Sequence, residues 1–285
     1  ANGENGALLL EPSRQQLIQF SEYFGDSSWT KGEVTTTDNA VKSPDGYVNA
    51  AAMVENSAVT AYHRILPTSP FFATASAYYS FSVYVKKIAG QPTRHIYWMC
   101  QKGADAIYAH FDMDDFSVNE QNDSGTGSVV DADIVPVGND WYRLTLSGIV
   151  TTAGGSSYNQ LYFEDSPSTG FNPTPYTGNG SSGFEIYGWQ IEAGSYVSSY
   201  IPNHGTSGGV TRAADSCSVT GASDVMPTSY PFTLYAEMDV KAIGDEWGIS
   251  FLDVSANNKY YVIGVNSVKK YSMLSRNNTA SSVQS

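Results

Sequence analysis

Acidic side chains are densest just after Phe111, where Asp112, Asp114 and Asp115 follow in close succession. Carboxylate oxygens are the hard ligands that calcium prefers, so these three residues are candidate calcium ligands. No EF-hand loop surrounds them, and a calcium site of another type draws its remaining ligands from distant segments. The alternative interpretation is a polar hairpin turn. No residue pattern indicates any cofactor other than calcium.

Aromatic side chains offer a second kind of chemistry, because sugar rings stack on Trp and Tyr while neighbouring amides and carboxylates bind the hydroxyl groups. The candidates for a glycan site are the rings with polar neighbours in the sequence: Trp29, Trp98, Tyr108, Tyr162 and Tyr176. The alternative for each ring is a place in a hydrophobic core or an interface. Trp141 precedes Arg143 in a strong strand pattern, which favours a core position.

Enzyme motifs are weak in this chain. Residues 205–209 read Gly-Thr-Ser-Gly-Gly and satisfy G-x-S-x-G, but a nucleophile elbow joins a strand to a helix, and this run has linker composition. A glycosidase needs two carboxylates facing one sugar bond, and nothing selects a pair among the 28 acidic residues. We therefore expect a protein that is not an enzyme.

The four histidines show neither HxH nor HExxH spacing, so they do not indicate a metal centre. His95 and His110 fit neighbouring strands of one hairpin, although ordinary surface or half-buried histidines are favoured. Cys100 and Cys217 lie far apart without CxxC spacing, which excludes zinc ribbons and thioredoxin-like sites. Two thiols and one long-range disulfide both remain open.

The charge balance excludes whole classes of partner. With 15 basic and 28 acidic residues among 285, the chain has a formal charge of −13 and would repel nucleic acid. No run approaches the roughly 18 apolar residues of a membrane span, so no membrane insertion is expected. Hydrophobic residues make up 41% of the chain, which is enough for a substantial core.

Short segments rich in Val, Ile, Tyr, Phe and Thr alternate with clusters of Gly, Pro, Asn, Asp and Ser, and this pattern predicts an all-β protein. The clearest strand predictions are Ala7–Leu10, Tyr79–Lys86, Arg94–Gln101, Ala106–Met113, Trp141–Ile149, Gln160–Glu164 and Gly183–Glu192. Residues Ala50–Glu55 fit a strand or a short helix, and we favour the strand. Many short strands separated by turns indicate a β-sandwich or jelly roll.

The run Asn203–Gly209 has the composition of a linker. We therefore predict a first domain over residues 1–203, a linker over 204–212, and the start of a second β domain over 213–285. Its predicted strands are Phe232–Val240, Trp247–Val254, Tyr260–Val265 and Lys270–Leu274. These strands hold too few residues for an independent large sandwich, so the second domain is expected to be small or incomplete, and we favour an incomplete domain.

Motifs at both ends of the first domain resemble a domain found in structural proteins of tailed phages and prophages. The opening is Leu8–Arg14 (LLLEPSR), then Ser21–Phe24 (SEYF), then Trp29–Lys31 (WTK). The close is Gly188–Tyr196 (GWQIEAGSY), then Ser199–Pro202 (SYIP), then Thr211–Asp215 (TRAAD). The resemblance covers residues 7–215. It departs at Gln15, Gln16 and Asn203, and none of these changes touches an obvious chemical group.

The resemblance implies a jelly-roll β-sandwich like that of carbohydrate-binding modules, followed by a concanavalin-like or laminin-G-like lectin domain. It further implies a head-fibre, tail-fibre or capsid-decorating protein of a virion. Such a protein acts in attachment, with other virion proteins and host-surface glycans as partners and often a trimeric assembly. The alternatives are a glycan-binding accessory module of a polysaccharide-degrading tailspike or secreted glycoside hydrolase, and a purely architectural domain.

Overall fold

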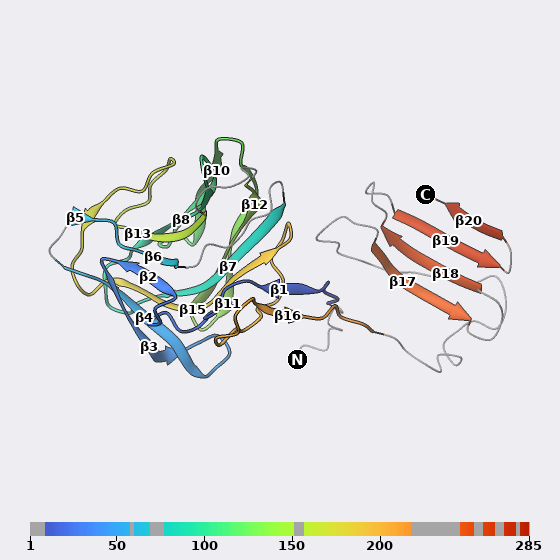
Figure 1. Ribbon diagram of the computed structural model, residues 1–285, viewed down its shortest axis with the longest axis horizontal. Coiled ribbons are helices and arrows are strands. Elements are labelled where there is room, and N and C mark those ends of the chain that lie inside the picture. The colour runs from blue at the N-terminus through green and yellow to red at the C-terminus, as the bar shows by residue number, and fades with distance from the viewer. Residues whose placement is uncertain are drawn as a thin grey trace. The chain divides into compact units, whose positions relative to one another are not determined.

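A computed structural model describes residues 9–57, 60–68, 77–150, 157–217, 246–253, 259–265, 271–277 and 280–284. These residues form strands, turns and loops, and none of them lies in a helix. The chain divides into one compact unit that ends at Ser216 and a second that begins at Cys217 (Figure 1). The first unit is an all-β sandwich, as the sequence predicts. The described residues also contain no helix that is long and apolar enough to cross a membrane.

Two six-stranded antiparallel sheets form the sandwich (Figure 1). The β8 sheet has the order β10 (Ser117–Ser124), β9 (Asp105–Asp112), β8 (His95–Lys102), β13 (Ser157–Glu164), β6 (Arg64–Pro67) and β2 (Trp29–Gly32). The β7 sheet has the order β11 (Ser128–Gly138), β12 (Trp141–Ile149), β7 (Tyr78–Lys87), β15 (Gly183–Ala193), β4 (Val48–Glu55) and β3 (Val34–Lys42). A two-stranded ribbon joins β5 (Thr60–Ala61) to β14 (Tyr176–Thr177).

The predicted strands within residues 79–192 lie on β7, β8, β9, β12, β13 and β15. Residues Ala50–Glu55 belong to β4, so the strand interpretation is confirmed over the helix. The predicted strand Ala7–Leu10 is wrong for Leu9 and Leu10, which lie in an irregular segment, and its first two residues fall outside the described part. Both leucines are exposed, so no sheet face holds them in register.

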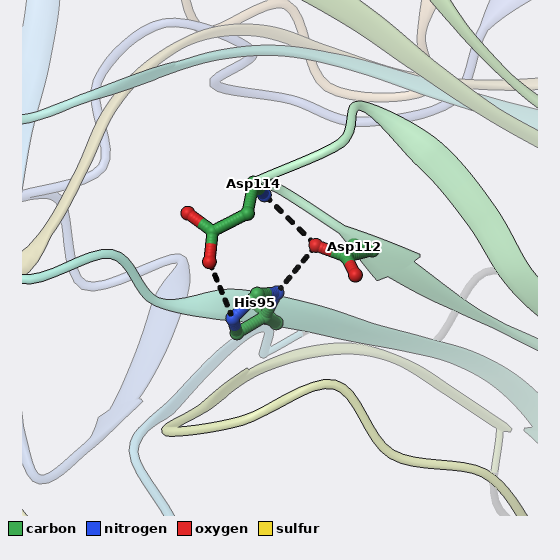
Figure 2. A group of neighbouring side chains, drawn as sticks. All are labelled: His95, Asp112 and Asp114. Carbon is green, nitrogen blue, oxygen red and sulfur yellow. Dashed lines mark hydrogen bonds and ion pairs between the residues drawn. The ribbon is translucent and has the colours of Figure 1, made fainter.

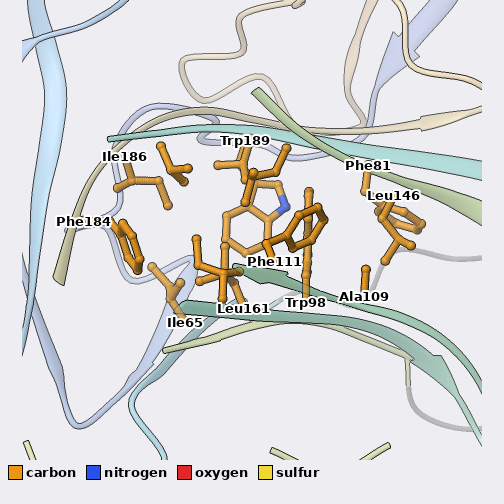
Figure 3. Close-up of a cluster of buried hydrophobic side chains, with 14 of the residues drawn as sticks. Ile65, Phe81, Trp98, Ala109, Phe111, Leu146, Leu161, Phe184, Ile186 and Trp189 are labelled. Atoms are coloured by element: carbon orange, nitrogen blue, oxygen red, sulfur yellow. The ribbon is translucent and has the colours of Figure 1, made fainter. Parts of the chain in front are cut away.

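The core fills the space between the inner faces of the two sheets (Figure 3). In β7 the alternation places Phe81, Val83 and Val85 at zero exposure against this core, as period-2 patterning requires. Trp98 of β8 and Trp189 of β15 meet edge to face with ring centroids 5.5 Å apart. Rings of this size, buried from both sheets, supply much of the apolar area that stabilises the sandwich.

The opening and closing motifs of the sequence meet in space. Strand β1 (Arg14–Gln16) pairs antiparallel with β16 (Val210–Arg212), and Phe20 forms a bridge to His204. The carboxylate of Glu11 accepts hydrogen bonds from the Arg212 guanidinium and from the backbone N–H of Ser199. The predicted linker 204–212 is therefore wrong, because its residues pair with the start of the chain and belong to the sandwich.

Gln16 and Asn203 are the polar centres of this terminal junction. The Gln16 amide donates to the carbonyls of Trp189 and Ile201 and accepts from the backbone N–H groups of Ile18 and Ile191. Asn203 likewise bonds to the backbone of residues 18, 205 and 206. The sequence shows no obvious chemical group at these departures from the family pattern, but the side chains of Gln16 and Asn203 satisfy buried backbone groups.

Replacing Gln16 with alanine is expected to lower the free energy of unfolding by about 2–4 kcal/mol, because four buried backbone groups lose their partner. Chemical denaturation of the intact chain measures this change. Gln15→Ala is the matched control, since Gln15 is exposed and its side-chain amide donates to the carbonyl of Gly208. Equal unfolding midpoints for the two variants would contradict the role assigned to Gln16.

The described residues of the second unit form a four-stranded antiparallel sheet in sequence order. Its strands are β17 (Glu246–Asp253), β18 (Lys259–Val265), β19 (Tyr271–Asn277) and β20 (Ala280–Gln284). Three of the four predicted strands lie on β17, β18 and β19, whereas Phe232–Val240 falls outside the described residues. The prediction of a second β region is confirmed, because these four strands all lie within residues 213–285.

Candidate functional site

Three of the five rings predicted to bind glycans are core residues. Trp29 and Trp98 are 3% and 0% exposed, and both pack against Trp189 in the main core. Tyr176 is 6% exposed, and its hydroxyl donates to the Glu55 carboxylate at 2.6 Å. The glycan predictions for Trp29, Trp98 and Tyr176 are therefore wrong, because no face of these rings reaches a solvent-accessible sugar. Trp141, at 1% exposure, is buried as expected.

The other two candidates, Tyr108 and Tyr162, lie on the outer face of the β8 sheet, away from the main core. They form a separate cluster with Tyr97, Met99 and Ala106. The cause is strand parity, since each strand sends alternate residues to opposite faces: Trp98 enters the core and its neighbour Tyr97 points outward. Once the residues that face the core are known in each strand, the alternate residues identify this outer face in the sequence. They are Tyr97 and Met99, Tyr108 and His110, and Tyr158, Gln160 and Tyr162.

One line of cross-strand neighbours runs over this outer face and is here named the aromatic row. Its members, in register from β10 to β6, are Glu120, His110, Tyr97, Tyr162 and Arg64. The ring centroids of Tyr97 lie 4.5 Å from those of His110 and 5.6 Å from those of Tyr162. The Arg64 guanidinium lies 5.6 Å from the Tyr162 ring centroid. Aromatic rings flanked by a carboxylate and a guanidinium thus form a continuous strip across five strands.

The β6 end of the row is open to solvent. Tyr62, which follows β5, is 44% exposed and meets Tyr162 edge to face at 5.8 Å. Arg64 Nη1 donates to Gln160 Oε1 at 2.9 Å and to the Tyr162 hydroxyl at 3.0 Å. Tyr158, four residues before Tyr162 on β13 and on the same outer face, is 41% exposed. This end presents an accessible tyrosine ring and a half-buried guanidinium, which are groups that bind sugar faces and hydroxyls.

The β10 end of the row is covered by residues 165–175, here named the 165–175 loop. The loop approaches the sheet closely, because Tyr97 donates its hydroxyl hydrogen to the carbonyl of Phe171 and the Phe171 ring meets Tyr108 at 5.6 Å. Burial raises the pKa of both Tyr97 and Tyr108, so their hydroxyls stay neutral. Tyr108 and Tyr162 are 4% and 6% exposed, and their role in binding remains a prediction.

The structure brings two of the three predicted calcium ligands together with a histidine (Figure 2). Asp112 Oδ1 lies 3.1 Å from His95 Nδ1, and Asp114 Oδ2 lies 3.9 Å from His95 Nε2. Asp115 is not part of this group. His95 was not among the candidates, although its opposition to Asp112 follows from the β8–β9 pairing of Ile96 with Phe111.

This group suits calcium poorly. Calcium takes six to eight oxygen ligands, whereas one imidazole and two carboxylates are a mixed set. Asp112 Oδ1 already accepts from the backbone N–H of Asp114 at 2.8 Å, which is the geometry of a hairpin turn. Lys87 Nζ lies 3.9 Å from Asp114 Oδ1 and supplies positive charge there. The polar-turn interpretation accounts for the contacts of Asp112 and Asp114, and calcium binding remains a prediction.

The two cysteines are free thiols in this structure, Cys100 buried in the core and Cys217 exposed. Burial raises the pKa of the Cys100 thiol well above its usual value, so it is an inert core residue.

No protein-family model and no curated protein matches this chain. One solved structure that is similar to it is the CBM22-1 xylan-binding domain of Xyn10C from Paenibacillus barcinonensis. The two are 13% identical, and the similarity covers 65% of this chain and 94% of that domain with a TM-score of 0.37. A similarity this distant carries no argument about what this chain binds.

Proposed function

We propose that the sandwich is a non-catalytic glycan-binding domain, and that it binds sugars on the outer face of the β8 sheet. The observation that carries the proposal is the aromatic row with its open end at Tyr62 and Arg64. Buried tyrosines hold the platform rigid, while the exposed ring of Tyr62 and the polar groups beside it contact the sugar. Binding through a preformed sheet face costs little ordering entropy.

The proposal extends to the whole protein. The motifs of residues 7–215 resemble those of tailed-phage structural proteins, and a glycan-binding sandwich suits an attachment role on a head fibre, tail fibre or capsid surface. Other virion proteins and further copies of the chain, as a trimer, are the proposed partners. Electron microscopy with an antibody to this chain tests the assignment: labelled fibres or capsids support it, and particles without label contradict it.

The second candidate is an accessory glycan-binding module of a polysaccharide-degrading enzyme. The same open end of the aromatic row supports this candidate, because a glycan-binding sheet face would serve a polysaccharide-degrading enzyme as well as a virion component. Sequence beyond Ser285 in the parent gene separates the two candidates, since a catalytic domain there supports the accessory module and fibre-like sequence supports the virion component.

Replacing both Tyr62 and Tyr158 with alanine is expected to weaken glycan binding about tenfold, because two exposed rings each contribute about 0.5–1.5 kcal/mol of stacking. The ligand is first selected on an array of bacterial surface polysaccharides, and the affinity is then measured by titration calorimetry. Melting temperature should stay unchanged, since neither ring is in the core.

Tyr47→Ala is the matched control, because Tyr47 is a 73% exposed tyrosine that precedes β4, in the other sheet. It should leave glycan affinity unchanged. Equal loss of affinity in the control, or full affinity in the double variant, would contradict a site on the β8 sheet.

A further inference from the structure

Arg64 is a cation that contacts no carboxylate within the described part of the chain. Its Nη1 donates to Gln160 Oε1 at 2.9 Å and to the Tyr162 hydroxyl at 3.0 Å, and both acceptors are uncharged. Three other arginines of the sandwich each form an ion pair with a glutamate. Carboxylates are not scarce in this chain, because acidic residues outnumber basic ones by 28 to 15. The positive charge of Arg64 is therefore free to attract a ligand.

One edge of the Arg64 guanidinium also has free hydrogen-bond donors. Nη1 uses both of its hydrogens on Gln160 and Tyr162, which leaves the hydrogens of Nε and Nη2 without an acceptor among the described residues. Neither nitrogen is among the buried atoms that lack a partner, so both reach solvent. The N–H groups of Nε and Nη2 lie side by side in the guanidinium plane, and such a pair matches the two oxygens of a carboxylate.

Gly32 of β2 keeps this edge of the guanidinium uncovered. It pairs with Arg64 in register, and a Cβ at residue 32 would lie 3.1 Å from Arg64 Cγ and 3.3 Å from Nε. The same Cβ would lie 3.6 Å from the carbonyl oxygen of Tyr62, so Tyr62 borders the same opening. A larger residue at position 32 would crowd the free donors, whereas glycine leaves room for a ligand beside them.

The Arg64 guanidinium is held in place before a ligand arrives. The Tyr162 hydroxyl donates to Gln160 Oε1 at 2.8 Å, so the two acceptors of Nη1 are themselves joined. Both belong to buried side chains of β13. The guanidinium also lies over the Tyr162 ring, with Cζ 5.6 Å from the ring centroid. A group fixed in this way loses little conformational entropy when it binds.

Two carboxylates on the same outer face do not neutralise Arg64. Glu164 of β13 is directed to other partners, because its oxygens contact His110 and Ser168. Glu120 lies at the far end of the aromatic row, four strand spacings or about 19 Å from Arg64. That distance is more than twice the Debye length of about 8 Å at physiological ionic strength. The aromatic row therefore has a positive end at β6 and a negative end at β10.

We propose that the open end of the aromatic row binds a carboxylate-bearing sugar, such as a uronic acid residue of an acidic polysaccharide. The carboxylate accepts hydrogen bonds from Nε and Nη2 of Arg64, and the sugar ring packs on the exposed ring of Tyr62. This inference rests on the proposed function, because it assigns a ligand class to the same surface. The net charge of −13 repels a polyanion at long range, so the attraction comes from the local guanidinium.

The first test alters the ligand and leaves the protein unchanged. The array of bacterial surface polysaccharides is printed in pairs, each uronic acid polymer beside its carboxyl-reduced counterpart, in which every carboxylate has become a primary alcohol. Affinity of the intact chain for the uronic acid polymer that it binds should fall about tenfold or more on reduction, because a bidentate bond between charged groups is lost. Equal affinity for dextran sulfate would contradict carboxylate recognition, since that polymer carries charge without a carboxylate.

Substitutions of Arg64 then test the position of the contact by titration calorimetry. Arg64→Gln should lower the affinity for the uronic acid polymer to that of its carboxyl-reduced counterpart. Arg64→Lys keeps the charge without the planar pair of donors, so it should recover only part of the affinity. Should Arg64→Gln fail to fold, Arg64→Lys and the paired ligands still decide the question.

Lys42→Gln is the matched control, because it removes the same charge from an exposed position on β3, in the other sheet. It should leave the affinity unchanged. Equal losses of affinity in Lys42→Gln and Arg64→Gln would overturn the inference, since net charge alone would then explain binding.

The outcomes separate this inference from the proposed function. Affinity that falls on carboxyl reduction and depends on Arg64 supports both. Glycan binding that is unchanged by carboxyl reduction, and is weakened when Tyr62 and Tyr158 are replaced with alanine, overturns carboxylate recognition and leaves the glycan site standing. Absence of binding to any polysaccharide contradicts the proposed function and this inference with it.

Discussion

Replacing Arg94 with methionine is expected to lower the free energy of unfolding by about 3–5 kcal/mol, because it leaves the Glu55 carboxylate buried and without its counter-charge. Arg94 and Glu55 are 8% and 1% exposed and form two parallel bonds of 2.7 and 2.8 Å. Glu55 also accepts from the Tyr176 hydroxyl and the Asn179 N–H. These contacts tie β4 to the segment that leads into β8 and to the loop after β14. Equilibrium denaturation in urea measures the change.

Lys86→Met is the matched control, because the Lys86–Glu185 pair is partly exposed and spans 3.6 Å. Its loss should cost less than about 1 kcal/mol. Burial raises the Glu55 pKa, but the bonds from Arg94, Tyr176 and Asn179 outweigh it, so the folded pKa lies below 4.5. The stability from this carboxylate is present above pH 4.5 and is lost as pH falls through the folded value. Equal destabilisation by both methionine variants would contradict the buried network.

Replacing Trp98 with alanine is expected to cost about 3–5 kcal/mol, because it opens a large cavity between the two sheets. Trp98 is fully buried, and its indole N–H and that of Trp189 both donate to Asn159 Oδ1. Truncation therefore removes a ring contact with Trp189 and one of the two hydrogen bonds that Asn159 Oδ1 accepts. Differential scanning calorimetry should show a fall in melting temperature of the sandwich.

Trp98→Phe keeps an aromatic ring in the core but loses the indole N–H donor and part of the ring volume. It should destabilise the fold by less than the alanine variant. Glycan affinity should be unchanged in Trp98→Phe, because residue 98 faces the core. Reduced affinity together with an unchanged melting temperature would show that this position contacts sugar.

The sequence predicts strands well and their faces poorly. Trp98 and Tyr97 are neighbours in one strand, so they face opposite sides of the sheet and one of them faces the core. The composition of the strand does not indicate which of the two it is. Trp98 has polar Asn159 beside it only because β13 pairs with β8, a contact between residues 61 positions apart. The sequence identifies Tyr162 as a candidate for glycan binding but not Tyr62, because the exposure of Tyr62 depends on the path of the chain after β5.

The predicted domain boundary at Asn203 shows a second limit of prediction from the sequence. A Gly-Ser-rich run has the composition of a flexible connector, but its conformation depends on what lies beside it. Here Gly209 has a φ of 93° and lies so close to β1 that a Cβ would meet the Gln16 carbonyl oxygen at 2.5 Å. Glycine at this position serves close packing of two backbones. Only the pairing of β1 with β16, across nearly 200 residues, reveals that role.

The most direct test of a sugar-binding outer face is an NMR titration of the intact chain with the array-selected polysaccharide. The account predicts that amide shift changes concentrate on β6, β13 and the residues beside Tyr62. Shift changes confined to the β7 sheet or to residues 246–284, or the absence of any change, would contradict it.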